Sequence, residues 1–358
     1  MKQIKETHFI SIINDLKKNS GFNSFIKTVQ NEIDELIDNK EWYEDESNCY
    51  KSAELEIVRK LNQKFEKILN VLSDVENLMF MSPIELNQKL LESQDLELDN
   101  KKPKEKNFSK KIQKILSYKE LRSGKKKLLY KFYRKLGIKA CVYCNSQHTI
   151  ILEGDKKTMR FQADHKINQG KFPMFSITLA NLYPTCNNCN HLKNQNNINY
   201  DLYYSDPIEK HSMKFSLSSE SIVKYCEQKD TEDASELIEI KFKDYNDISE
   251  KDRNDNLNKV LHIDKIYENH KDIVANLINK KLVYNNQYLE DLSNIFKSLF
   301  ENNDDTINKL LFNEMIYGKS LEEEDINKGV FAKLTLDIKN QLDEIEFEDG
   351  FVLPKIRL

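Results

Sequence analysis

The chain has 358 residues, of which 39% are hydrophobic and 32% charged, with a net charge of −4. This length can bury the core of two or three domains, and the composition is typical of a globular protein rather than a disordered, collagen-like or membrane-spanning one. No apolar run approaches the roughly 18 residues of a transmembrane helix, and the N-terminus mixes charges into its apolar positions, unlike a signal peptide. Six cysteines do not suggest a disulfide scaffold, so we expect a cytoplasmic protein with no membrane partner.

Residues 1–98 are predicted to form a helical N-terminal region. From residue 7 onward, apolar side chains recur every three or four positions, beginning with Phe9, Ile12, Ile13 and Leu16. This spacing places the apolar side chains on one face of each helix. The region is therefore expected to pack several amphipathic helices against one another.

Residues 99–136 are predicted to be a basic linker or helix. The segment 101–140 contains 14 lysines and 2 arginines but only 2 glutamates, so it carries +14 while the rest of the chain carries −18. Most charge runs of this kind are solvated helix faces. This one also suits a nucleic-acid-binding surface, because lysine and arginine neutralise phosphates and release their counterions. On that interpretation, Lys125, Lys126 and Lys127 bind DNA.

Four of the six cysteines form two pairs with two residues between the members of each pair: Cys141, Cys144, Cys186 and Cys189. Two such pairs supply the four ligands of a closed tetrahedral zinc site. A thioredoxin-like redox site needs only one pair, in a βαβ setting that is absent here. We therefore expect structural zinc, and we interpret Cys49 and Cys226 as small apolar side chains.

Two short strands are predicted between the cysteine pairs. Residues 148–153 (HTIILE) and 160–165 (RFQADH) alternate apolar and polar side chains, and a hairpin turn is expected at Gly154. The second strand ends in Asp164 and His165. Because adjacent strand residues point to opposite faces, the roles assigned to these two below require the strand to bend or end there.

The order of these residues resembles the HNH endonucleases. The pattern is Cys-x-Tyr-Cys, then Asp-His, then Asn-Leu-x-Pro-x-Cys-x-x-Cys-Asn-x-x-Lys, and it covers about residues 137–200. The resemblance implies an α+β, mainly α-helical protein, with a central ββα-metal (HNH) module at 137–206 that holds structural zinc. Helical regions, 1–98 and 207–358, would flank this module. It also implies one catalytic divalent ion and cleavage of DNA.

The chemistry of phosphodiester hydrolysis suggests a role for each residue of the pattern. The reaction needs a base for water and a cation for the developing charge. A histidine can be the base, so His165 is the predicted general base. Carboxylate and amide oxygens suit a hard cation such as Mg²⁺ or Mn²⁺, which makes Asp164 and Asn190 the predicted ligands. By the resemblance, Asn181 braces the loop that orients His165.

Some assignments near the second cysteine pair have rivals. His191 competes with Asn190, but adjacent helical residues diverge by about 100°, and Asn190 directly follows the cysteine pair as in the family. Lys193 either contacts a phosphate or is an exposed helix lysine. His148, at the start of the first strand, is interpreted as structural.

Residues 207–358 are predicted to be a mostly helical region with short strands at 214–218 and 236–243. A helical stripe over 263–277 includes His270, which is interpreted as a packed core histidine. The residues 131–145 and 260–282 resemble HNH nucleases encoded beside an ATPase in bacterial anti-phage defence systems, of the Septu or retron-associated kind. This second resemblance implies an ATPase partner.

Three functions compete at this point. The leading one is a metal-dependent DNA endonuclease. The second is a non-catalytic zinc-knuckle module for nucleic-acid binding or assembly. The third is a restriction-type enzyme with its own sequence reader in the helical flanks. The chain has only six arginines, and arginine is the commonest direct reader of guanine, which disfavours the third.

Overall fold

The computed structural model divides the chain into two compact units. The first contains Gln3–Ile138 and Thr149–Lys210, and the second contains Met1–Lys2, Lys139–His148 and His211–Leu358. The residues that the structure describes are 3–40, 42, 44–45, 47, 52–154, 157–204, 214–242, 256–284, 288, 291, 314, 316–318 and 322–345. They are mainly helical with short two-stranded sheets, which confirms the α+β class. No helix among them is both long and apolar enough to cross a membrane.

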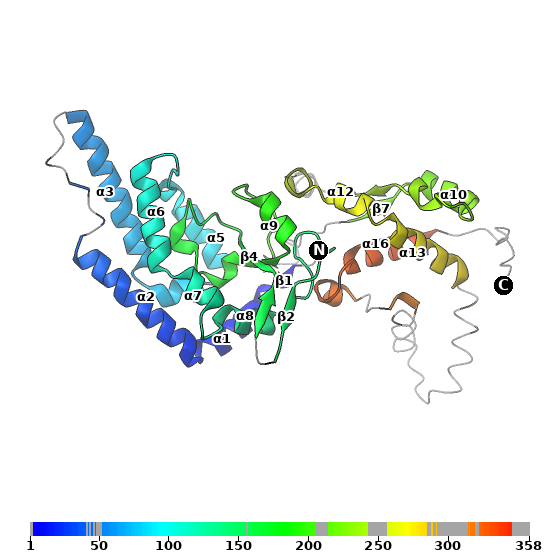
Figure 1. Cartoon of the computed structure of the whole chain (residues 1–358), viewed down its shortest axis with the longest axis horizontal. Coiled ribbons are helices and arrows are strands. Elements are labelled where there is room, and N and C mark those ends of the chain that lie inside the picture. Colours follow the sequence, from blue (N-terminus) through cyan, green and yellow to red (C-terminus); the bar gives the residue numbers. More distant parts are fainter. Residues whose placement is uncertain are drawn as a thin grey trace. The chain divides into compact units, whose positions relative to one another are not determined.

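Amphipathic helices begin the first unit, as the apolar spacing predicts (blue to cyan in Figure 1). They are α1 (Glu6–Lys17), α2 (Ser20–Asp38), α3 (Ser52–Leu72), α4 (Val75–Phe80), α5 (Pro83–Glu92) and the 3₁₀ turn η1 (Gln94–Leu96). Local polar side chains set where some of them start. Asp74 accepts a hydrogen bond from the backbone of Asn77, and Ser82 forms a capping box with Glu85 ahead of α5.

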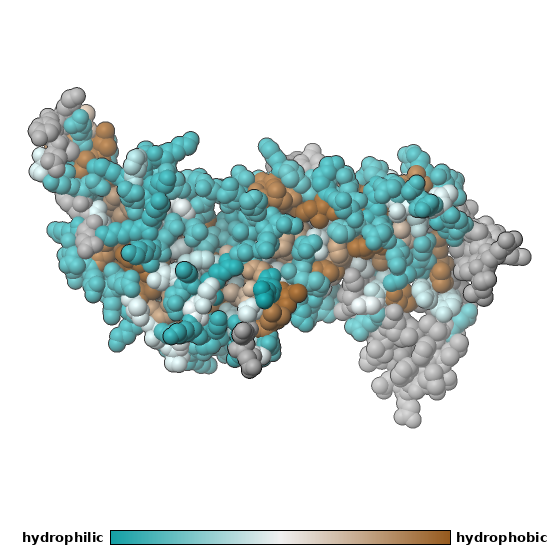
Figure 2. All heavy atoms as spheres, in the orientation of Figure 1, coloured by the Kyte–Doolittle hydropathy of each residue, from teal (hydrophilic) through white to brown (hydrophobic). Residues whose placement is uncertain are grey.

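The basic segment folds into three further helices of the same unit: α6 (Pro103–Ile115), α7 (Tyr118–Ser123) and α8 (Leu128–Leu136). Phe108 of α6 stacks on Phe65 of α3 with ring centroids 3.8 Å apart, and Phe132 of α8 meets Phe9 of α1 edge-on. The segment is therefore not a linker, because its apolar faces are buried in the core of the unit. Its lysines lie mostly outside, and Figure 2 shows a mainly hydrophilic surface over α6.

The strands pair differently from the prediction. β2 (Ile150–Leu152) and β3 (Thr158–Arg160) form the expected antiparallel hairpin. However, β4 (Gln162–His165) pairs with β5 (Leu182–Thr185) instead of continuing β3. The predicted single strand over 160–165 is therefore wrong. The chain bends at Phe161, whose buried ring packs edge-on against Tyr133, and this bend separates β4 from the hairpin.

A strand–loop–strand–helix order follows the hairpin. The loop between β4 and β5 contains two 3₁₀ turns, η2 (Pro173–Phe175) and η3 (Leu179–Asn181), and β5 leads directly into α9 (Asn187–Lys193). The first unit is completed by a parallel pair of strands, β1 (Ile4–Lys5) and β6 (Tyr203–Tyr204).

The second unit contains the first cysteine pair and the C-terminal elements. The described elements are β7 (Ser216–Leu217), α10 (Ser219–Gln228), η5 (Ala234–Leu237), β8 (Ile240–Lys241), α12 (Ile263–Glu268), α13 (Lys271–Val283), η6 (Glu323–Lys328) and α16 (Ala332–Glu344). β7 and β8 pair antiparallel, at the two places where the sequence predicts short strands. The helical stripe over 263–277 breaks between α12 and α13. His270 lies half-buried at this break, with its ring 4.6 Å from that of Phe331.

Asn145 connects the first cysteine pair to the C-terminal part of the second unit. Its buried side-chain amide donates to the carbonyls of Ile326 (3.0 Å) and Gly329 (3.2 Å), and its Oδ1 accepts from the backbone of Lys333 (3.0 Å). Its φ of 53° lies in the left-handed region, where asparagine is enriched. These bonds explain why Lys139–His148 groups with the C-terminal region, whereas the sequence predicts one module over 137–206.

Replacing Asn145→Ala is expected to lower the free energy of unfolding of the second unit by about 3 kcal/mol. The reason is that one buried carbonyl, one partly buried carbonyl and one buried N–H lose their partner, and alanine tolerates a positive φ less well. Urea unfolding measures the change. The control is Asn269→Ala, which removes an exposed side chain with one hydrogen bond to the carbonyl of Lys265. Equal stability of the two variants would contradict the role of Asn145.

Candidate functional site

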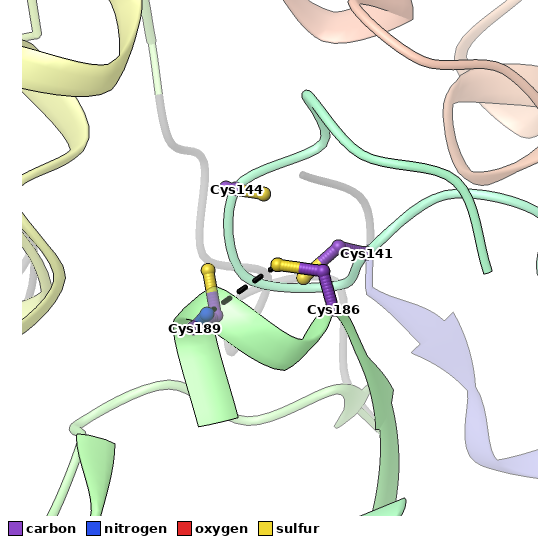
Figure 3. A group of neighbouring side chains, drawn as sticks. All are labelled: Cys141, Cys144, Cys186 and Cys189. Atoms are coloured by element: carbon purple, nitrogen blue, oxygen red, sulfur yellow. Dashed lines mark hydrogen bonds between the residues drawn. The ribbon is translucent and has the colours of Figure 1, made fainter. Parts of the chain in front are cut away.

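Four buried cysteines form a cluster that can hold a metal ion such as zinc: Cys141, Cys144, Cys186 and Cys189. Their sulfurs all lie within 4.8 Å of one another and point toward one another in Figure 3. In a tetrahedral zinc–thiolate site the sulfurs lie about 3.8 Å apart, so a small contraction brings all four to ligand distance. The four cysteines thus come together, as predicted, in a group that could hold a metal ion, and its all-sulfur chemistry suits zinc.

Local hydrogen bonds position these thiols. Cys186 is the N-cap of α9, and its sulfur accepts from the backbone N–H of Cys189 at 3.4 Å. The hydroxyl of Ser146 donates to the sulfur of Cys144 at 3.2 Å. Such bonds favour the thiolate, which is the form that binds metal. By contrast, burial raises the pKa of the Cys226 thiol, and Cys226 does not belong to the cluster. Cys49 lies outside the described residues.

A polar cavity of about 530 Å³ lies in the first unit, beside the end of β4 and the start of α9. Asp164, His165 and Asn190 line it, so the two predicted ligands and the predicted base share one site. His191 also lines it: Asn190 is half-buried, and His191 is exposed. The argument from helical divergence therefore does not separate these two side chains.

His165 is the last residue of β4, where the chain turns into the loop. Its Nε2 lies 2.9 Å from the carbonyl oxygen of Ser176. Because a carbonyl can only accept, Nε2 is the donor, and Nδ1 of the neutral ring is left as the acceptor. The ring of Tyr118 packs against the imidazole edge-on at 4.7 Å. Burial lowers the pKa of His165 to about 4, so the ring is neutral at neutral pH.

Asn181 spans the loop between β4 and β5. Its fully buried side chain accepts from the backbone N–H of Ile167 (2.7 Å) and donates to the carbonyls of Phe175 (2.9 Å) and Ile167 (3.3 Å). It does not line the cavity. Phe175 is adjacent to Ser176, whose carbonyl holds His165, so Asn181 acts on the geometry of the loop rather than on the cavity itself.

Lys193 occupies a place that neither sequence interpretation describes. Its side chain is 2% exposed, so it is not an exposed helix lysine. The ammonium lies 3.1 Å and 3.2 Å from the two carboxylate oxygens of Asp164 and donates to the carbonyl of His165 at 2.7 Å. Lys193 therefore connects the last turn of α9 to the last two residues of β4. The predicted phosphate contact stays a prediction, and the ammonium already has these two partners.

The cavity also has walls that the sequence reasoning missed. Tyr118 and Arg122 of α7 line it, together with Gln113 of α6. The sequence places these three residues in the basic segment, which was already a candidate for binding. Helical periodicity, however, does not predict which distant strand a helix packs against. The predicted DNA-binding residues Lys125, Lys126 and Lys127 are in the turn between α7 and α8, and they do not line the cavity.

Comparison with known proteins finds no match among family models, among curated proteins or among solved structures.

The purified protein is expected to contain one zinc ion per chain, measured by plasma mass spectrometry after dialysis. Cys186→Ser should lose most of the zinc, because it removes one of the four thiolate ligands while serine can still cap α9. Cys226→Ser is the matched control, since it changes a buried cysteine outside the cluster and should keep the metal. Equal zinc contents in the two variants would contradict the site.

Lys193→Met is expected to lower the free energy of unfolding by about 3 kcal/mol, because it leaves the buried carboxylate of Asp164 without its ammonium partner. The double variant Asp164→Asn with Lys193→Met should recover part of this loss, since the uncompensated charge is gone. Urea unfolding measures both. The control Lys60→Met breaks an exposed ion pair with Glu56 and should change stability by less than about 1 kcal/mol. Additive effects in the double variant would refute the coupling.

Proposed function

We propose that this chain is a metal-dependent endonuclease of the HNH type that hydrolyses phosphodiester bonds in DNA. The observation that carries the proposal is that Asp164, His165 and Asn190 line one polar cavity. The order of the motif residues along the chain supports it. The strand–loop–strand–helix order of β4, β5 and α9 also agrees with a ββα module.

His165 has the properties that a general base needs. The hydrogen bond to Ser176 holds the ring, and the buried neutral imidazole keeps Nδ1 free of a proton at neutral pH. Nδ1 can then take a proton from the water that attacks phosphorus, while the bond from phosphorus to the leaving oxygen breaks. In this scheme, Asn181 is a positioning residue because it braces the loop that carries Ser176.

The donors at the cavity fit a hard divalent cation. A carboxylate has about four lone-pair positions, so Asp164 can accept from Lys193 and still offer oxygen to a metal. The amide oxygen of Asn190 is the second donor, and Mg²⁺ commonly binds through one or two protein oxygens together with water and substrate phosphate. When bound, such an ion would offset the charge that develops on the phosphate oxygens.

A non-catalytic zinc-knuckle module is the second candidate. The cysteine cluster favours it, because four buried thiols can stabilise a fold with no reaction at the cavity. This candidate leaves the shared cavity of Asp164, His165 and Asn190 without a role, which is why we rank it second.

The proposal extends to partners. The basic helices of the first unit suit DNA, and the resemblance of residues 131–145 and 260–282 to defence nucleases suggests an ATPase partner in the bacterial cytoplasm. In that setting the ATPase would control when the nuclease cuts.

The nuclease activity is tested on supercoiled plasmid with Mg²⁺, with Mn²⁺ and with EDTA, in the presence of co-purified partners. Wild type should nick or linearise the plasmid only with a divalent ion. His165→Ala should lower the rate by at least about 100-fold, the usual range for loss of a general base. Asp164→Ala should also lower the rate, because it removes a ligand of the divalent ion. Asn190→Ala and His191→Ala, compared side by side, identify which of the two supports the metal.

His8→Ala is the matched control, because it removes an exposed histidine of α1 in the same unit and should cut like wild type. Plasmid that stays intact with wild type under all these conditions would favour the non-catalytic module. Cleavage that persists in His165→Ala would refute the assigned base.

A further inference from the structure

A single arginine stands out in the wall of the polar cavity. We infer that Arg122 binds a phosphate of the substrate strand, an inference that rests on the proposed function for the identity of the substrate as nucleic acid. Arg122 belongs to α7, far along the chain from the motif residues, and no part of the HNH-like pattern includes it.

The packing of α7 brings Arg122 to the cavity. Tyr118 and Arg122 are four residues apart and therefore share one face of this short helix. On that face the hydroxyl of Tyr118 donates to the carbonyl of Ala163 at 3.1 Å, and its ring contacts His165. Both side chains line the cavity together with Asp164 and His165.

Hydrogen bonds orient the guanidinium of Arg122 and still leave some of its N–H donors for a ligand. Its Nη2 donates to the carbonyl oxygen of Phe161 at 3.2 Å, at the bend just before β4, and the hydroxyl of Tyr118 is a second hydrogen-bond partner. A guanidinium has five N–H groups in a fixed plane, so these two bonds orient the group and leave further donors. Arg122 is half-buried, which limits the screening of its charge by water.

The charge of the cavity wall points to an anion at Arg122. Among the described residues that line the cavity, Arg122 is the one lysine or arginine and Asp164 is the one carboxylate, beside the histidines His165 and His191. The charge of Asp164 is compensated by Lys193 from behind the wall. Most of the remaining lining is uncharged and rich in amides, including Gln113, Asn168 and Gln195.

Arginine suits a phosphate better than lysine does. Its planar fork matches two phosphate oxygens at once, whereas an ammonium acts as a point charge. In a lysine-rich chain with only six arginines, the cavity is lined by an arginine. The rival explanation is structural, namely that Arg122 only anchors the carbonyl of Phe161.

DNA binding without cleavage separates these explanations. The probe is a fluorescein-labelled 20-base-pair duplex in EDTA, and fluorescence anisotropy follows its affinity over a range of NaCl concentrations. Arg122→Gln should weaken binding about 10-fold, as for loss of a charged hydrogen bond, and should reduce the slope of log affinity against log salt by about 0.9. Arg122→Lys should keep most of the slope because it keeps the charge.

Arg134→Gln is the matched control, because its guanidinium forms an exposed ion pair with Glu153 and does not line the cavity. It should keep the affinity and slope of wild type. Arg122→Gln with wild-type affinity and slope would overturn the inference and leave the structural explanation. If Arg122→Gln unfolds, the test uses Arg122→Lys instead. A smaller salt slope of DNA binding in Arg122→Lys, despite its retained charge, would overturn the inference.

Cleavage is measured separately, so the two proposals can fail independently. A wild-type protein that binds DNA through Arg122 but never cuts would overturn the nuclease and leave the phosphate site. A nuclease whose DNA affinity and salt slope do not change in Arg122→Gln would keep its function and lose the phosphate site.

Discussion

The geometry of the candidate site depends on one buried ion pair. The ammonium of Lys193 lies against both carboxylate oxygens of Asp164 and also bonds the carbonyl of His165, so a single side chain of α9 holds the last two residues of β4. A buried charge without a partner is costly, which makes this contact hard to replace. Because Cys186 is the N-cap of α9 and Cys189 lies in its first turn, the same short helix also positions two thiols of the cysteine cluster.

A second set of bonds fixes the loop on the other side of His165. Asn181 makes hydrogen bonds to Ile167 and Phe175 with no exposure to water, and the neighbouring carbonyl of Ser176 selects the tautomer of His165. Burial then keeps the imidazole neutral. The site is thus held by hydrogen bonds and one internal ion pair, and Arg122 lines the cavity beside them.

The basic segment serves two purposes. Its apolar side chains, such as Phe108 and Phe132, pack into the helical core of the first unit, while many of its lysines stay in water. Tyr118 and Arg122 instead line the polar cavity, where they bond the carbonyls of Ala163 in β4 and of Phe161 just before it. The net charge of −4 is the sum of +14 in residues 101–140 and −18 in the rest of the chain, so it does not indicate whether the protein binds nucleic acid.

The sequence by itself determined the helical N-terminal region, the set of four cysteines and the order of the motif residues, because periodicity and ligand spacing are local properties. Only the tertiary structure decided the pairing of β4 with β5, the burial of Lys193 and the approach of Arg122. Phe161, at the bend, packs against Tyr133 of α8, and Lys193 meets Asp164 only where β4 and α9 pack together. Such contacts join residues distant in sequence, so no local pattern carries them.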